Sequence, residues 1–144
     1  MPVTIPALRT EIDTDPKALG YATLRTQSNG PEAVAARMNE AGASAETLFK
    51  TYVPLEDMLA EIVFSEYSGW SAAQKTNIDQ FLRGTRIKTG SANMRTTLGA
   101  LIPAGASRTA LVALASRSAT RAEILFGEGV TVTDQQAAEA MTAP

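Results

Sequence analysis

The chain offers carboxylates and hydroxyls for chemistry, but no imidazole and no thiol. Its 144 residues include neither histidine nor cysteine. This removes the commonest general base, the thiolate nucleophile and the nitrogen and sulfur ligands of zinc. Paired carboxylates are the remaining candidates for acid–base work or for binding a hard cation. We therefore expect a protein that is not an enzyme and that has no cofactor and no metal.

Two groups of acidic residues come closest to a catalytic or metal-binding pattern. They are Glu11, Asp13 and Asp15, and Glu56, Asp57 and Glu61. The first group is similar to the start of a calcium-binding loop, but Lys17 occupies the fifth position, and the glycine and closing glutamate of that motif are missing. The second group fits the negatively charged start of a helix and its solvated face. Neither group predicts a site.

No hydroxyl nucleophile or nucleotide-binding motif stands out. Without histidine, a Ser-His arrangement cannot exist. A Ser-Lys dyad would need a lysine at helical spacing, and only Ser71 with Lys75 has it. Ser71 is better explained as the N-cap of a helix. The glycines form neither GxGxxG nor the P-loop pattern, so we expect no small-molecule substrate.

Basic residues are concentrated in one part of the chain. Between Gln80 and Ala122 there is no acidic residue, but there are Arg83, Arg86, Lys88, Arg95, Arg108, Arg117 and Arg121. Such a run could bind DNA phosphates. However, the net charge is −2, and no aromatic residue alternates with the run to stack on bases. We expect the basic half to meet an acidic half, either within the chain or on a neighbouring subunit.

Three aromatic residues, Phe64, Tyr67 and Trp70, lie at the turn between two predicted helices. Such a cluster can be a corner of the core or an anchor for a protein partner, since Tyr and Trp favour interface centres. The candidate partner contacts of the chain are therefore Trp70, Tyr67, Arg83, Arg86, Arg95 and Arg117.

Size and composition predict one helical domain over residues 1–144, with residues 142–144 as a frayed tail. Hydrophobic residues make up 44% of the chain and charged residues 19%. The first residues have no basic region before an apolar stretch, so no signal peptide is expected. The longest apolar runs are about four residues, against the ~20 that span a bilayer, so we expect no membrane contact.

Glycine and proline divide the sequence into short segments with helical spacing of apolar residues. The predicted helices cover 5–14, 32–40, 55–66, 72–82, 92–102, 107–115, 118–126 and 134–141. Segments 17–29 and 44–51 fit either a loop or a helical turn, and only Val130–Val132 reads as extended. In the core, Ile62 and Val63 should pack against Ile78 and Leu82. The prediction is an all-α fold, a compact irregular bundle of seven to eight short helices.

The order of these segments is similar to that of a known family. A short helix ends in a Thr-Asp-Pro step and leads into a Gly-Tyr turn, a Val-Pro step opens a later helix, and a glycine-rich break precedes a Leu-rich segment. These features lie at 8–22, 52–54, 70–75, 99–105, 107–115, 118–127 and 130–134. Together they resemble small virion structural proteins of tailed bacteriophages.

The resemblance implies a non-enzymatic virion protein that is assembled in the host cytoplasm. It would act through contacts with copies of itself and with other virion proteins in a symmetric tail assembly, as a tail-tip, baseplate or fibre-attachment protein. A head–tail connector or a head-surface protein is the alternative place on the particle. The rival class is a phage nucleic-acid-binding protein that uses the basic segment 83–121.

Overall fold

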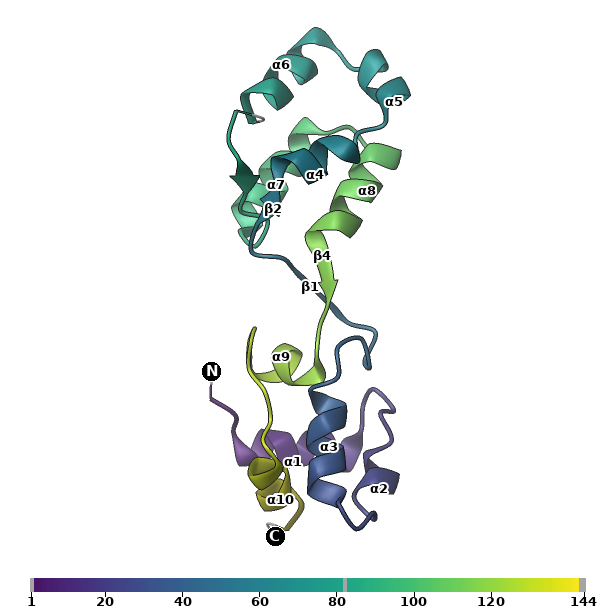
Figure 1. Ribbon diagram of the computed structural model, residues 1–144, viewed down its shortest axis with the longest axis vertical. Coiled ribbons are helices and arrows are strands. Elements are labelled where there is room, and N and C mark those ends of the chain that lie inside the picture. The colour runs from purple at the N-terminus through teal and green to yellow at the C-terminus, as the bar shows by residue number, and fades with distance from the viewer. Residues whose placement is uncertain (1, 82, 143–144) are drawn as a thin grey trace. The chain divides into compact units, whose positions relative to one another are not determined.

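The computed structural model describes residues 2–81 and 83–142, which are mostly helical (Figure 1). The chain forms two compact units. The terminal unit comprises Met1–Thr47 and Ser118–Pro144, and the central unit comprises Leu48–Arg117. The central unit is therefore an insertion between the two halves of the terminal unit. No helix among the described residues is long and apolar enough to cross a membrane.

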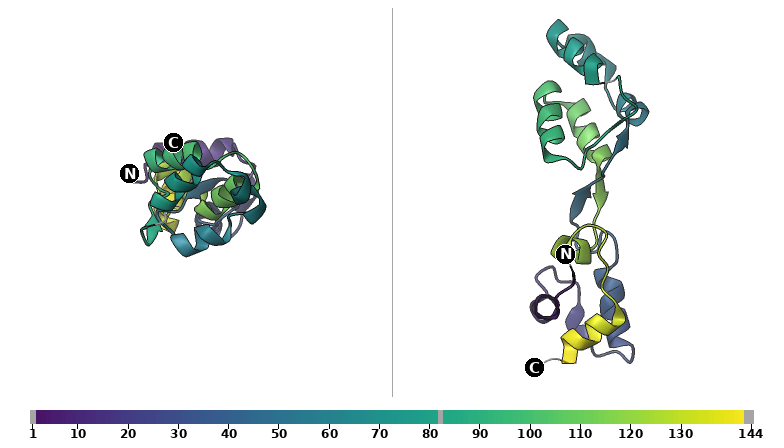
Figure 2. Two further views of the ribbon diagram at one scale, coloured as in Figure 1. Left: turned by 90° about the horizontal axis from the view of Figure 1, so that it is seen from above. Right: turned by 90° about the vertical axis from the view of Figure 1, so that its left-hand side faces the viewer.

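In the part of the terminal unit that the structure describes, there are five helices. They are α1 (Ile5–Thr14), α2 (Tyr21–Leu24), α3 (Gly30–Met38), α9 (Arg121–Phe126) and α10 (Asp134–Thr142). Helix α10 packs against both α1 and α3 (Figure 2). Its buried positions are Ala137 and Ala140, three apart on one face, and their small side chains let the helices approach closely. The core residues are Leu8, Ile12, Leu19, Tyr21, Val34, Ala35, Met38, Ala122, Phe126, Val132, Ala137 and Ala140.

Asp15 ends α1 and closes the following loop. Its backbone is left-handed, with φ 40°, a conformation that aspartate tolerates better than most side chains. Its carboxylate accepts hydrogen bonds from the backbone N–H groups of Leu19 (2.6 Å), Gly20 (2.8 Å) and Tyr21 (3.3 Å). The Thr-Asp-Pro step therefore positions the start of α2 as well as the end of α1.

Among the described residues, five helices and a two-stranded antiparallel sheet build the central unit. The helices are α4 (Leu55–Ala60), α5 (Phe64–Gly69), α6 (Ala72–Phe81), α7 (Ala92–Leu101) and α8 (Ala106–Ala115). Strand β2 (Val53–Pro54) pairs antiparallel with β3 (Arg86–Ile87). The core residues are Val53, Leu55, Met58, Trp70, Ile78, Ile87, Ile102, Leu111 and Ala115.

Two paired strands carry the chain between the units. Strand β1 (Thr47–Phe49) leads out of the terminal unit, and β4 (Ser116–Ser118) leads back into it. The two strands form a two-stranded sheet. Backbone hydrogen bonds flank this sheet at both ends, from Lys50 to Ala115 (2.7 Å) and from Ala119 to Glu46 (2.9 Å).

The predicted helix 55–66 is wrong as a single element, because the chain breaks between α4 and α5. Val63 is extended, and its N–H donates to the Ser107 hydroxyl at 2.8 Å. Three residues later, the Glu66 carboxylate accepts hydrogen bonds from the N–H groups of Ala106 (2.6 Å) and Ser107 (2.8 Å). The break thus allows α5 to cap the N-terminus of α8, where a negative charge is favourable.

The same break changes the predicted core. Ile78 is buried and Ile62 is partly buried, whereas Val63 and Leu59 are exposed. Leu82 lies outside the described residues. The apolar stripe therefore divides after Met58: its first part faces the core and most of the remainder faces solvent.

The all-α prediction holds only as a mostly helical fold. The described residues form ten helices, not seven to eight, and also four strands in two small sheets. The strands have two or three residues each, too few for an alternating pattern to show in the sequence. The sequence predicted one domain over residues 1–144, whereas the chain divides into two compact units. Of the predicted tail 142–144, Thr142 is the last residue of α10, and 143–144 lie outside the described residues.

Several helix ends follow the sequence prediction closely. Helix α1 has the predicted bounds, and Ser71, Ser91 and Thr133 each accept a hydrogen bond from a backbone N–H three residues on. The segment 118–126 differs, because Thr120 is the N-cap of α9, in a capping box with Glu123. Val130–Val132 joins no sheet, and the side-chain amide of Asn39 bonds the backbone of Val132 on both its N–H and its C=O.

We predict that Glu66 makes the stability of the central unit pH-dependent. Hydrogen bonds from the Ser107 side chain and from the Ser107 and Ala106 N–H groups hold the pKa of Glu66 below its ordinary value. A carboxyl whose pKa is lower in the folded state stabilises the fold above its unfolded pKa, and that contribution is lost as the pH falls through the folded pKa. The wild type should therefore lose more stability than Glu66→Gln between about pH 6 and about pH 3.

Denaturant unfolding followed by the fluorescence of Trp70, the single tryptophan of the chain, measures this in the central unit. The control is Glu61→Gln, which neutralises an exposed carboxylate five residues earlier. A Glu66→Gln variant that keeps the full acid sensitivity of the wild type would contradict the capping role. Gly105→Ala should weaken the same cap, because a Cβ at that position would collide with the Glu66 carboxylate.

Candidate functional site

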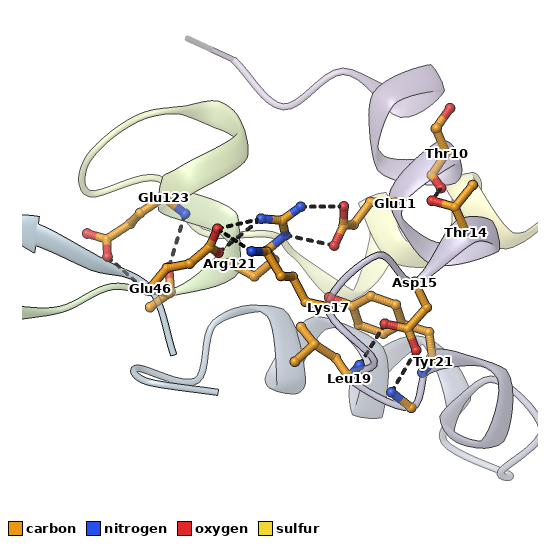
Figure 3. A network of polar contacts seen from close by, with 12 residues as sticks. Thr10, Glu11, Thr14, Asp15, Lys17, Leu19, Tyr21, Glu46, Arg121 and Glu123 are labelled. Carbon is orange, nitrogen blue, oxygen red and sulfur yellow. Dashed lines mark hydrogen bonds and ion pairs between the residues drawn. The ribbon is translucent and has the colours of Figure 1, made fainter. Parts of the chain in front are cut away.

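Charged side chains in the terminal unit converge on Arg121, the first residue of α9 (Figure 3). The guanidinium donates to both carboxylate oxygens of Glu11, with Nε–Oε1 at 2.8 Å and Nη2–Oε2 at 2.9 Å. Its Nη1 donates to Glu46 at 2.9 and 3.1 Å. The Lys17 ammonium lies 3.2 Å from Glu46. Two cations therefore balance two carboxylates in one network.

Local structure fixes each member of this Arg121 network. Glu11 lies on the buried face of α1, three residues after Leu8 and next to Ile12. The capping box of Thr120 and Glu123 sets where α9 begins and so where Arg121 stands. The network joins segments that are 110 and 75 residues apart in sequence.

Two members of the network, Arg121 and Glu46, have pKa values that favour their charged forms. Hydrogen bonds to Glu11 raise the pKa of Arg121 against the opposing effect of its burial, and Glu46 adds to the rise. Burial alone would raise the pKa of Glu46, but its hydrogen bonds, those of Arg121 and Lys17 among them, lower it overall. A Glu46 carboxylate held charged in this way cannot act as a general acid near neutral pH.

Tyr21 lies beside this network without joining it (Figure 3). Its side chain is fully buried, and its hydroxyl has no hydrogen-bond partner. Burial raises the pKa of Tyr21 above its ordinary value, and the charges of Glu11 and Asp15 add to the rise. The phenol therefore stays protonated and serves as a core side chain.

The acidic residues that resembled a calcium loop have separate partners. Glu11 pairs with Arg121, Asp13 accepts a hydrogen bond from Arg25 at 2.9 Å, and Asp15 holds backbone N–H groups. Within residues 2–81 and 83–142, no three carboxylates come together in a way that could hold a metal ion. The Ser71 hydroxyl is likewise used as a cap, and the Lys75 ammonium lies 5.2 Å from the centre of the Tyr67 ring.

Trp70 and Tyr67, two of the predicted partner contacts, belong to the core region of the central unit. Trp70 is only 9% exposed, and its ring meets the Tyr67 ring edge to face, with the centroids 5.5 Å apart. Phe64, the third aromatic residue of this segment, is 81% exposed. The structure thus separates the predicted cluster into two packed rings and one accessible ring.

The predicted basic contacts lie on different elements of the central unit: Arg83 in the turn before β3, Arg86 in β3, Arg95 in α7 and Arg117 in β4. Arg86 stands 4.1 Å from the centre of the Tyr52 ring, and Arg95 stands 4.0 Å from the centre of the Phe49 ring. Arg83 is exposed, and Arg117 is partly exposed in β4. Arg121 of the same basic run is buried among acidic residues. Of the basic run, Arg121 therefore meets acidic residues of the same chain, whereas Arg86 and Arg95 lie against aromatic rings.

Large apolar side chains are exposed in the central unit. Among the described residues, all those that are markedly exposed lie there: Phe49, Tyr52, Leu59, Val63, Phe64 and Val112. Leu59, Val63 and Phe64 follow one another from the end of α4 to the start of α5, and we call them the apolar ridge. Exposed apolar residues gathered on one unit are typical of protein-interaction surfaces.

A cavity of about 190 Å³ lies between α7 and α8. We call it the α7–α8 cavity, and its lining is Phe49, Met58, Thr89, Arg95, Leu98, Gly99, Ile102, Arg108, Leu111, Val112 and Ala115. Two of these residues, Phe49 and Val112, are substantially exposed, so the cavity reaches the surface. Arg108 is held by hydrogen bonds to the carbonyls of Gly99 and Ile102 at the end of α7.

Sequence reasoning missed both surfaces for identifiable reasons. The apolar ridge was not predicted, because Leu59 and Val63 fit the apolar, core-facing stripe of the single helix expected over 55–66. The cavity depends on tertiary packing of α7 and α8 against Met58, which no local pattern encodes. The available signals were Gly99, which lies inside α7, where glycine is unfavourable, and the break before Gly105.

No family model, curated protein or solved structure matches this chain.

We predict that the Arg121 network is the strongest polar contribution to the stability of the terminal unit. Arg121→Met should lower the free energy of unfolding by ~3–5 kcal/mol, because it leaves Glu11 buried without a counter-charge. The matched control is Arg25→Met, which removes the exposed pair with Asp13 and should cost at most ~1 kcal/mol. Denaturant unfolding followed by far-ultraviolet circular dichroism compares the two, and equal losses would contradict the structural role.

Proposed function

We propose that this protein is a non-enzymatic virion structural protein of a tailed bacteriophage, which acts through protein–protein contacts in a symmetric tail assembly. The observation that carries the proposal is the concentration of exposed apolar side chains, together with an open apolar cavity, on the central unit. Isolated side chains of this kind are ordinary on a surface, but a ridge and a cavity on one unit of about 70 residues call for a partner.

The charge distribution supports a role in assembly. The central unit carries eight basic and five acidic residues, and the terminal unit carries five basic and ten acidic residues. Identical copies arranged about an axis can join two different patches of the same protein. Opposite charges on such patches guide association and disfavour incorrect pairings.

The resemblance to small virion proteins supports the place in the particle. A tail-tip, baseplate or fibre-attachment protein is the first choice, and a head–tail connector or head-surface protein is the alternative. The charged side chains of the Arg121 network and the Glu66 cap are used to hold the fold together, which fits a component that works by contact and not by turnover.

Mass spectrometry of gradient-purified particles tests the proposal. We expect the protein in particles at a fixed copy number consistent with a symmetric ring, because a ring has a defined number of identical subunits. A known tail protein of the same particle provides the copy-number reference. Absence of the protein from particles, while it is present in the infected-cell lysate, would overturn the proposal.

One observation favours nucleic-acid binding as a second candidate function. Arg86 and Arg95 stand over the rings of Tyr52 and Phe49, both of which are partly exposed. Aromatic rings beside arginines are used by proteins that bind single strands through base stacking and phosphate contacts. The sequence had given no sign of this arrangement, because each pair joins residues more than 30 positions apart.

We expect DNA binding by the purified protein to be no tighter than the weak background of non-specific binders, whose dissociation constants are about 10⁻⁴–10⁻⁶ M at physiological salt. Fluorescence anisotropy with labelled single- and double-stranded DNA at several salt concentrations measures it. Tight, salt-sensitive binding that Arg86→Glu and Arg117→Glu abolish would favour the nucleic-acid function. The control is Arg25→Glu in the terminal unit, which should leave any such binding unchanged.

A further inference from the structure

We infer that the α7–α8 cavity of one copy receives Phe64 of a second copy, so that the central units associate head to tail. The inference deepens the protein-contact role proposed above and rests on it for its biological setting. Both surfaces belong to the central unit alone.

The size and lining of the cavity suit a phenyl ring. A cavity of ~150 Å³ lined by aliphatic and aromatic side chains is enough to bind benzene, and the α7–α8 cavity measures about 190 Å³. Leu98, Ile102 and Leu111 contribute apolar walls. The side chain of Phe64 is 81% exposed, the highest value among the large apolar residues of the described chain, so it is available for insertion.

Charge complementarity favours a second copy of this chain as the occupant. The ridge belongs to the acidic part of the central unit, in which residues 56–66 contain four carboxylates and no basic residue. Asp79 lines the groove beside Phe64. The cavity belongs to the basic part, in which residues 83–117 contain no acidic residue, and Arg95 and Arg108 line it. Docking of ridge into cavity would place opposite charges around the inserted ring.

The two surfaces occupy different faces of the unit. Met58 of α4 is buried and lines the cavity, whereas its neighbour Leu59 is exposed and lines the groove beside Phe64. Consecutive residues of a helix point about 100° apart, so α4 separates the ridge from the cavity. A contact between two different patches is heterologous, and repeated copies then close into a ring or extend as a filament.

Sedimentation velocity of three purified proteins tests the inference over about 10 μM to about 1 mM. The wild type should form species larger than a dimer. Phe64→Ala removes the inserting ring, and Gly99→Leu fills the cavity at a position where an added Cβ meets open space. Each variant alone should be monomeric, with association weakened at least about tenfold by the loss of the buried ring.

Mixing the two variants gives the decisive result. Gly99→Leu retains Phe64, and Phe64→Ala retains the open cavity, so the mixture should form a one-to-one dimer that grows no further. The control is Tyr52→Ala, which removes an exposed ring that lines neither surface and should associate like the wild type. Circular dichroism confirms that each variant is folded, and Val112→Glu replaces Gly99→Leu if the latter does not fold.

A wild type that stays monomeric up to about 1 mM, or a mixture that fails to form the dimer, would overturn the inference. Self-association through Phe64 by a protein that is absent from particles would overturn the virion role alone. If the Phe64→Ala protein enters particles at the wild-type copy number, the docking is overturned and the virion role is not.

Discussion

The ion pairing of Arg121 with Glu11 and Glu46 is the constraint on which the terminal unit depends. This unit is built from two segments separated by the whole central unit, so it cannot be completed until the chain has returned from the insertion. A buried guanidinium is costly unless all its partners are in place. Because Glu11 comes from α1, Glu46 precedes β1 and Arg121 opens α9, the network penalises arrangements in which the two segments do not meet correctly.

In the central unit, charged side chains at two helix ends hold the irregular connections of the chain in place. The Glu66 carboxylate sits at the N-terminus of α8, and the Arg108 guanidinium sits at the carbonyls that end α7. Each charge lies at the helix end where the backbone dipole favours its sign. The irregular connections at Val63 and Gly105 are therefore held by specific polar contacts, even though they interrupt the helical pattern.

The sequence anticipated the features that depend on neighbouring residues and missed those that depend on distant ones. The bounds of α1 and the caps at Ser71, Ser91 and Thr133 follow from local hydrogen bonds, so spacing and residue type were sufficient. The break at Val63 depends on Ser107, 44 residues away, and an unbroken apolar stripe over 55–66 concealed it. Arg121 appeared as one more member of a basic run, because its two acidic partners lie far earlier in the chain.

The two units use their side chains differently. In the terminal unit, the carboxylates of Glu11, Asp13 and Asp15 accept hydrogen bonds from arginine side chains or backbone N–H groups of the same unit. The central unit satisfies its helix ends but leaves the apolar ridge and the α7–α8 cavity open to solvent. Exposed apolar surface has no stabilising value for an isolated chain and carries a risk of aggregation. Its concentration on the inserted unit is therefore the observation on which the proposed protein contact depends.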